Sequence, residues 1–278
     1  MAAAADAQSL YFGLLASAEG MSGKSEIAGA IARAAVSRVT HGRGALHVRR
    51  PVVLSCAGLR WWVPALDNSF ASTVPGRDNN CVMPELRRLL ATRPSGVCLD
   101  VGANLGFVCM PLAREFPAHR FVAVEPVPWL ADALERSAQL NHLSNVTVAA
   151  RAIADSPSIE LAIPTVGGVH LTTLSSGSEH ASPEAAGKAM ARHRVPAVTL
   201  DALLDELGIA PAELACVKID VEGLEAEVLS TGRRALSARP PVLFEALRPA
   251  LRESAESVLR SIGYREFHRL DEQNFSAS

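Results

Sequence analysis

The stretch 97–125, VCLDVGANLGFVCMPLAREFPAHRFVAVE, decides the fold of this chain. Its first part, 97–101, is a short apolar run that ends at Gly102, which is typical of a buried strand. Residues 105–116 have helical spacing, and 121–124 form a second apolar run. The order strand, glycine turn, helix, strand predicts half of a mononucleotide-binding unit, in which ligands lie beyond the carboxyl ends of parallel strands.

The chemistry of the glycine turn favours one kind of nucleotide ligand. A dinucleotide site uses G-x-G-x-x-G, but this turn has only Gly102 and Gly106, and Asp100 precedes them. A carboxylate repels a pyrophosphate and suits the ammonium group of an amino acid. Glu125 follows Gly102 by 23 residues (125 − 102), where a carboxylate accepts hydrogen bonds from a ribose diol. This set favours S-adenosylmethionine over NAD; the alternative is an ordinary unit whose glycines only permit close packing.

Composition sets the class of protein. With 278 residues, 49% of them apolar and 20% charged, the chain is globular, with room for a domain of about 200 residues and an extension. No apolar run reaches the roughly 20 residues that span a bilayer, and no basic leader precedes the first apolar segment. The net charge of −2 gives no general footprint for nucleic acid. We expect a cytoplasmic protein with no membrane span and no nucleic-acid partner.

Cysteine and histidine spacing argues against a metal site. The five cysteines form no metal-binding motif, and their odd number fits reduced thiols in a cytosol. His170, His180 and His193 lack the i, i+4 spacing of a metal pair on a helix. We therefore expect no metal.

One charge imbalance stands out near the N-terminus. Between Glu26 and Asp67 there are six arginines but no lysine and no acid. Such a run contacts an anionic substrate or a membrane surface, or it is a solvated helix face followed by a strand edge. The second interpretation is favoured, because the run has no interleaved aromatic residues.

Two parts of the chain are expected: an N-terminal extension over 1–75 and a ligand-binding domain over 76–278. The extension is predicted to contain a helix within 1–45 and a hairpin over 52–65. It caps an active site, makes a homodimer contact or touches the acceptor, and the sequence does not choose. In the domain, further helices are expected over 84–91, 129–140, 200–207, 224–236 and 250–262. Further strands are expected over 145–149, 159–163, 169–174, 195–200, 215–220, 241–245 and 263–268, with a short last strand.

A second informative stretch, ACVKIDVEG at 215–223, brings two acids and a lysine to the end of a predicted strand. Ligand chemistry occurs at this end of open α/β sheets. A buried unpaired lysine is costly, so Lys218 is expected to pair with Asp220 or Glu222. The segment 152–155 follows the third strand, where an adenine ring usually rests. Asp155 either accepts from the adenine amino group or forms a turn.

Five motifs occur in order: DVGANLG at 100–106, AVEPVP at 123–128, VTLDALL at 198–204, KIDVEGLEAEVL at 218–229 and PPVLFE at 240–245. Together they resemble the FkbM-type S-adenosylmethionine-dependent methyltransferase family, over about 75–270. The resemblance implies a class I methyltransferase: an α/β fold with a seven-stranded, mostly parallel sheet, helices on both faces and one antiparallel strand near an edge. It also implies O-methylation of a hydroxyl on a sugar, a macrolide or another secondary metabolite.

The resemblance also implies site residues. The cofactor-binding set by position is Asp100, Gly102, Ala103, Asn104 and Gly106 at the methionine end, Glu125 and Pro126 at the ribose, Ala152 and Asp155 near adenine, and Asp220. Asp220 and Glu222 match the acidic motif beside the methyl group. The chain departs from the family pattern at 169–173, which makes His170 a local acceptor-side residue. Candidate bases are therefore Asp220, then Glu222, then His170, although both acids also have a structural interpretation as partners of a helix dipole.

Three alternatives stay open. An N-methyltransferase would share this fold. An NAD-dependent oxidoreductase would share the first strand–helix–strand unit and the ribose acid, but the missing third glycine and Asp100 count against it. A non-catalytic partner subunit would show damage in the donor motifs, and these are intact.

Overall fold

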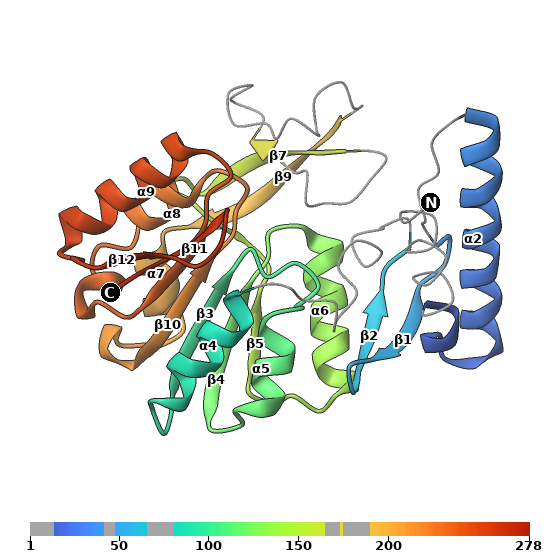
Figure 1. The fold of residues 1–278 in the computed structure, drawn as a ribbon, viewed down its shortest axis with the longest axis horizontal. Coiled ribbons are helices and arrows are strands. Elements are labelled where there is room, and N and C mark those ends of the chain that lie inside the picture. The colour runs from blue at the N-terminus through green and yellow to red at the C-terminus, as the bar shows by residue number, and fades with distance from the viewer. Residues whose placement is uncertain (1–13, 42–47, 66–80, 165–172, 175–189) are drawn as a thin grey trace.

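The computed structural model describes residues 14–41, 48–65, 81–164, 173–174 and 190–278. Its centre is a seven-stranded sheet with helices on both faces (Figure 1), in the order β12-β13-β11-β10-β3-β4-β5. The strands are β3 Gly96–Val101, β4 His119–Val124, β5 Val146–Ala149, β10 Leu214–Ile219, β11 Val242–Glu245, β12 Phe267–Arg269 and β13 Asn274–Ala277. Strand β13 runs antiparallel to both of its neighbours, whereas the other paired strands are parallel. The predicted α/β class is confirmed.

Alternate residues of the strands face opposite layers of the core, as the period of a strand requires. In β3, Cys98 faces the layer that contains α4 (Val82–Ala91), α5 (Cys109–Glu115) and α6 (Pro128–Leu140). Val97, Leu99 and Val101 face the layer with α7 (Leu200–Glu206), α8 (Glu225–Ser230) and α9 (Pro249–Ile262). Burial on both faces explains why β3 reads as a near-continuous apolar run.

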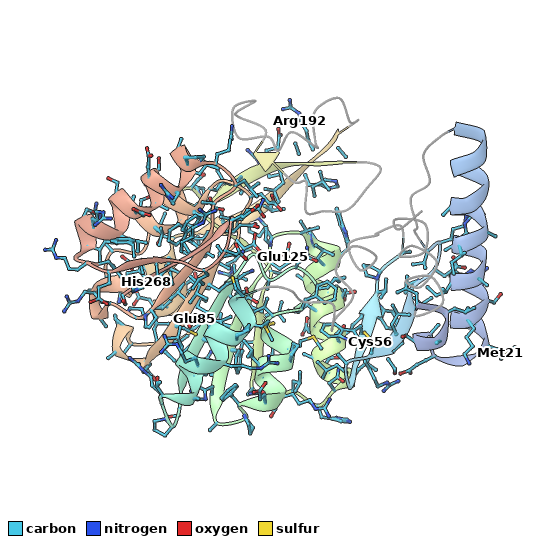
Figure 2. The ribbon with its side chains drawn as sticks, viewed as in Figure 1. Met21, Cys56, Glu85, Glu125, Arg192 and His268 are labelled. Carbon is cyan, nitrogen blue, oxygen red and sulfur yellow. The ribbon has the colours of Figure 1, made fainter. Side chains whose placement is uncertain are left out.

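A second, four-stranded sheet lies beside the carboxyl ends of the main strands, above them in Figure 1. Its order is β6-β9-β7-β8, with β6 Ala152–Ile153, β7 Ser158–Pro164, β8 Thr173–Leu174 and β9 Met190–Val198. Strands β7 and β9 form its long antiparallel pair, from Ser158↔Pro196 to Pro164↔Met190. The sheet extends over the side of the molecule on which Figure 2 shows Glu125.

The N-terminal extension packs on α6. It contains α2 (Gly20–His41) and the hairpin of β1 (Val52–Cys56) and β2 (Leu59–Val63), which lies between α2 and α6 in Figure 1. The Trp62 backbone N–H donates to Ser137 Oγ of α6 at 2.8 Å, and the Trp61 ring lies 5.1 Å from the Phe107 ring. The predicted hairpin over 52–65 is therefore present and shares the core of the sheet.

Acids that precede the arginine-rich run neutralise two of its members. Arg33 pairs with Glu26 at 3.0 Å, and Arg60 pairs with Glu19 at 2.7 Å. All four side chains keep some exposure to solvent, so these are surface ion pairs of small energy. This arrangement agrees with the solvated-face interpretation.

Two predicted helices are shorter than expected, for local reasons. The helix predicted over 105–116 begins at Cys109, because Gly106 has a φ of 84°, which a right-handed helix excludes. The helix predicted over 224–236 ends at Ser230 and is followed by a 3-10 turn, Ala235–Ala238. The Asp201 carboxylate accepts hydrogen bonds from the backbone N–H groups of Arg234 and Ala235 and so caps the start of the 3-10 turn.

Two strands also have different limits. The strand predicted over 195–200 begins at Met190, since its pairing with β7 extends that far. The strand predicted over 263–268 begins only at Phe267, after Gly263 in a left-handed conformation has ended α9. Of the strand predicted over 169–174, only Thr173–Leu174 lies within the described residues.

Candidate functional site

The turns after β3 and β10 touch each other at Gly102. This glycine has a φ of 80°, and a Cβ built on it would lie 1.8 Å from the Asp220 carbonyl oxygen. The N–H groups of Gly102 and Ala103 donate to the Val124 carbonyl at 2.9 and 3.0 Å, which ties the turn to the end of β4. Only glycine permits both this close approach and the backbone conformation. Three strand ends therefore meet in one place.

Glu125 ends β4 and supports the glycine turn. Its side chain is buried, with Oε2 accepting from the Asn104 N–H at 2.8 Å and Oε1 from the Val127 N–H at 2.9 Å. A carboxylate oxygen can accept two hydrogen bonds, so each Glu125 oxygen still has the capacity to accept one from a ligand hydroxyl. Burial raises the pKa of Glu125 to about 7, although the two backbone N–H groups act in the opposite direction.

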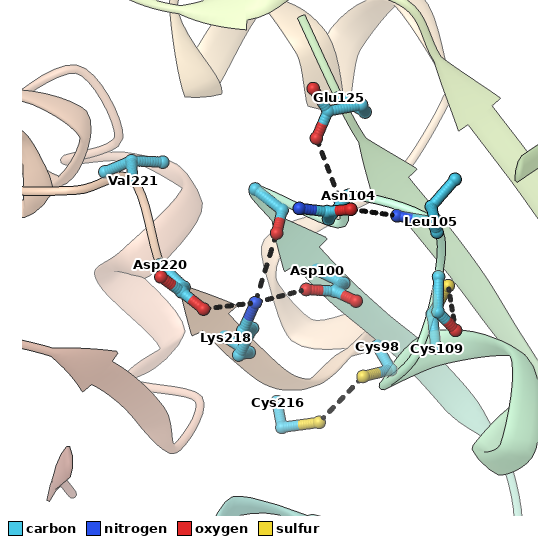
Figure 3. A network of polar contacts seen from close by, with 12 residues as sticks. Cys98, Asp100, Asn104, Leu105, Cys109, Glu125, Cys216, Lys218, Asp220 and Val221 are labelled. Carbon is cyan, nitrogen blue, oxygen red and sulfur yellow. Dashed lines mark hydrogen bonds and ion pairs between the residues drawn. The ribbon is translucent and has the colours of Figure 1, made fainter. Parts of the chain in front are cut away.

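Lys218 is the centre of a polar network that crosses β3 and β10 (Figure 3). Its Nζ lies 3.1 Å from Asp100 Oδ1, 3.2 Å from Asp220 Oδ2 and 3.2 Å from the Gly102 carbonyl oxygen. Burial alone would lower the pKa of Lys218, but the charges of Asp100 and Asp220 outweigh it and hold the pKa above its ordinary value. The expected pairing of Lys218 with an acid of its own motif is confirmed, and Asp100 is an additional partner.

The two acids that contact Lys218 differ in exposure. The Asp100 side chain is 1% exposed, whereas the Asp220 side chain is 37% exposed. Asp100 is held by the charge of Lys218 rather than by an aligned hydrogen bond, and its Oδ2 accepts no hydrogen bond from the described residues. A buried carboxylate with unused acceptor capacity needs a further partner. Of these two acids, Asp220 is the one that solvent reaches.

The turn after β10 has a strained backbone and is stabilised by a buried side chain. Glu222 has a φ of 56°, a left-handed conformation that is unusual for a residue with a long side chain. The buried Glu225 stabilises this turn, since its Oε1 accepts from the N–H groups of Gly223 at 3.0 Å and Val221 at 3.3 Å. Burial raises the pKa of Glu225 to about 7. Glu225 thus fixes the loop that presents Asp220.

Glu245, at the end of β11, also belongs to the site. Strand β11 pairs with β10 in parallel with Ile219 opposite Phe244, so the next residues along the two strands, Asp220 and Glu245, are neighbours. Burial, followed by the nearby charge of Asp220, raises the pKa of Glu245 to about 9. Sequence reasoning missed Glu225 and Glu245 as site residues, although both stand in motifs singled out above: Glu225 in KIDVEGLEAEVL and Glu245 as the last residue of PPVLFE.

The remaining predicted residues are placed as follows. Pro126 is half-buried beside Glu125, Ala152 is buried in β6, and Asp155 is exposed in the turn after β6. Among the described residues, no hydrogen bond or ion pair joins Asp155 to the Lys218 network. His170 lies outside the residues that the structure describes.

The acids at these strand ends suit a ligand that carries a positive charge. Acids at the ends of β3, β4, β10 and β11 face one region, and Asp100 has a buried oxygen to spare. Within the described ranges, no three His, Cys, Asp or Glu side chains are grouped so as to hold a metal ion. None of the described helices combines the length and apolar character of a bilayer-spanning segment.

A family model of the methyltransferase FkbM domain matches residues 100–269, which is more than half of the chain. The chain belongs to the FkbM methyltransferase family. It is accordingly an S-adenosylmethionine-dependent methyltransferase, and its sheet has the class I order. The resemblance that the sequence motifs predicted is confirmed, and the family assignment decides against the NAD-dependent alternative. A comparison with curated protein sequences finds no significant match.

The solved structures to which this chain is similar share little sequence identity with it. The methyltransferase domain of METTL16 is 11% identical with a TM-score of 0.47, over 98% of this chain and 90% of that one. The M. jannaschii protein TYW2 in complex with AdoMet is 12% identical with a TM-score of 0.43, over 82% and 84% of the two chains. A SAM-dependent O-methyltransferase from Thermotoga maritima is 11% identical with a TM-score of 0.44, over 81% and 77%.

Proposed function

We propose that this FkbM methyltransferase is an O-methyltransferase that acts on a hydroxyl of a sugar, a macrolide or another secondary metabolite. The observation that supports the proposal is the position of Asp220, a reachable carboxylate at the end of β10 whose loop is fixed by Glu225. A hydroxyl is a weak nucleophile while it keeps its proton. A carboxylate placed beside it takes that proton as attack proceeds.

The residues of the glycine turn and of β4 would hold the donor. In this proposal Glu125 accepts from the ribose diol, and Asp100 with the turn from Gly102 to Gly106 lies at the amino-acid end. Ala152 and Asp155 remain the proposed adenine side. When bound, the donor supplies a methyl group on a cationic sulfur that leaves as a neutral thioether. The protein orients the acceptor oxygen, excludes water and receives the proton.

Asp220→Asn tests the proposed base. We expect turnover to fall by about 10²–10⁴-fold, because a general base contributes this much, while donor affinity measured by calorimetry changes little. Asp132→Asn is the matched control, since Asp132 is an exposed acid on α6 whose ion pair among the described residues is with surface Arg136. Loss of donor binding in Asp220→Asn would instead make Asp220 a donor ligand or a structural group.

Glu125→Ala tests the proposed donor site from the other side. Removing hydrogen bonds to a charged acceptor costs about 1.5–3 kcal/mol, so donor affinity should fall by roughly 10–100-fold. Turnover at saturating donor should fall much less. If Glu125→Ala leaves donor affinity unchanged, the ribose is held elsewhere and the placement is wrong.

Fewer residues can be proposed for the acceptor side of the site. Glu222 is the second candidate base, and its strained backbone is an independent reason to substitute it. His170 is the third candidate. We propose that the N-terminal extension over 1–75 contacts the acceptor or a second copy of the chain. An acceptor panel that pairs each hydroxyl compound with its amine analogue separates O-methylation from the N-methylation alternative.

A further inference from the structure

The ammonium group of Lys218 contacts three segments of the site at once (Figure 3). Its Nζ lies 3.1 Å from Asp100 Oδ1 of β3 and 3.2 Å from Asp220 Oδ2 after β10, and it donates to the Gly102 carbonyl oxygen of the glycine turn at 3.2 Å. An ammonium group has three N–H donors and no acceptor, so these three acceptors match its full donor capacity. The Lys218 side chain is only 8% exposed, and water therefore competes little for its donors. The ammonium is held at one place between the strand ends.

The backbone at Asp220 is fixed without the help of Lys218. The Asp220 N–H donates to the Val101 carbonyl at 3.0 Å, and the Asp220 carbonyl oxygen lies against Gly102. The buried Glu225 carboxylate holds the rest of the same turn through backbone N–H groups. These bonds place the main chain, but they do not restrict the rotation of the Asp220 side chain.

The orientation of the Asp220 carboxylate depends on its contact with Lys218. Among the described residues, Lys218 is the cation in contact with Asp220. At 37% exposure, an aspartate side chain without a fixed partner moves between rotamers. Because Nζ contacts Oδ2, the other carboxylate oxygen lies outside this ion pair and can receive a proton.

The same ammonium contacts the donor side of the site. Gly102 belongs to the turn that, in the proposed function, lies at the amino-acid end of the donor, and Asp100 precedes that turn. Lys218 thus sets the distance between the proposed base and the turn that would hold the donor. Methyl transfer requires the base, the acceptor oxygen and the methyl group in one alignment, and a misplacement of about 1 Å can reduce the rate by about 10²-fold.

We infer that Lys218 is a positioning residue of methyl transfer, which holds the Asp220 carboxylate at a fixed place relative to the glycine turn. The inference rests on the proposed function, in which Asp220 takes the proton of the acceptor hydroxyl. In this role Lys218 touches neither the acceptor nor the methyl group and acts through Asp220. The proton of the hydroxyl goes to Asp220, and Lys218 keeps its three protons throughout.

Crystal structures of two variants test the orientation without any acceptor. Asp100→Asn is the reference background, because it removes the buried acid that a substitution of Lys218 would leave without its cation. We expect the Asp220 carboxylate to keep its position in Asp100→Asn and to leave it in Asp100→Asn/Lys218→Met, while the backbone of both turns stays in place. Asp100→Asn/Lys218→Leu is a second variant of the same kind, for use if the methionine variant does not fold. If the carboxylate keeps its position without Lys218, another neighbour such as Glu245 orients it and the inference is wrong.

Turnover in two backgrounds tests whether Lys218 acts through Asp220. The substrates are S-adenosylmethionine and the hydroxyl compound of the acceptor panel that the wild-type protein methylates fastest. In the Asp100→Asn background, Lys218→Met should lower kcat by about 10–100-fold. In the Asp100→Asn/Asp220→Asn background it should have little effect, since no carboxylate base is left to position.

Donor affinity and a surface variant serve as controls. Lys218→Met should change the affinity for S-adenosylmethionine, measured by calorimetry, much less than kcat, because the N–H groups of Gly102 and Ala103 still tie the glycine turn to the Val124 carbonyl. Arg87→Met removes the cation from an exposed ion pair with Glu115 and should leave turnover unchanged.

The outcomes separate this inference from the proposed function. If Lys218→Met lowers kcat equally in both backgrounds, Lys218 does not act through Asp220 and the inference is wrong, whereas a large effect of Asp220→Asn leaves the proposed base standing. If Asp220→Asn alone leaves turnover unchanged, the proposed base itself fails. If no compound of the panel is methylated, the position of the Asp220 carboxylate in the crystal structures decides.

Discussion

Replacing Lys218 with methionine is expected to destabilise the protein mainly through Asp100. Lys218 contacts two carboxylates, but only Asp100 is enclosed, at 1% exposure. Removing one partner of a buried ion pair costs about 3–5 kcal/mol, because the other charge is left without compensation. The share of Asp220 is small, since at 37% exposure solvent screens it and such pairs contribute about 0–1 kcal/mol.

The free energy of unfolding should therefore fall by about 3–5 kcal/mol at pH 7, measured by urea or guanidinium unfolding. For a chain of this size each kcal/mol lowers the melting temperature by about 2–4 °C, so the expected decrease is on the order of 10 °C. Lys24→Met is the matched control, since Lys24 is exposed on α2, and its effect should stay within about 0.5 kcal/mol.

A second substitution identifies Asp100 as the cause, since Asp100 is the enclosed partner of Lys218. Adding Asp100→Asn should restore most of the lost stability. A loss below 1 kcal/mol, or one that persists unchanged with Asp100→Asn, would refute this reasoning.

Three further predictions concern the turns and the ribose acid. Gly102→Ala should destabilise the protein by more than about 4 kcal/mol in chemical unfolding, because the new Cβ would lie 1.8 Å from a backbone oxygen. Gly208 is also left-handed but has open space around it, so Gly208→Ala should cost about 1 kcal/mol, and similar losses in the two variants would contradict the contact between the two turns. Burial raises the folded-state pKa of Glu125 to about 7, so the contribution of Glu125 to the free energy of unfolding should fall as pH rises from about 4.5 through 7. If the free energy of unfolding depends on pH in the same way in Glu125→Gln as in the wild-type protein, this prediction is wrong. Glu225→Ala should lower the free energy of unfolding by about 1–3 kcal/mol and reduce turnover, since two loop N–H groups lose their acceptor. Glu225→Gln keeps an amide oxygen and should lose less stability and less turnover; equal losses in the two variants would mean that the charge and not the acceptor matters.

Local patterns in the sequence were sufficient for the order of the elements and for most of the site. Apolar runs that stop at a glycine or an acid mark strand ends, and parallel strands bring those ends to one edge of a sheet. Asp100, Glu125 and Asp220 could therefore be expected to lie near one another from their places in the chain. Helix limits were less predictable, because the 3-10 turn that follows α8 is held by Asp201, a residue of another helix.

Tertiary structure alone decided how the acids of the site are paired and which of them are buried. Lys218 contacts Asp100 across the β3–β10 register, a pairing between residues 118 positions apart (218 − 100) that no local pattern contains. Glu245 becomes part of the site because β11 lies next to β10, and burial there raises its pKa to about 9. Charge states follow from burial and neighbours, and both exist only once the strands have assembled.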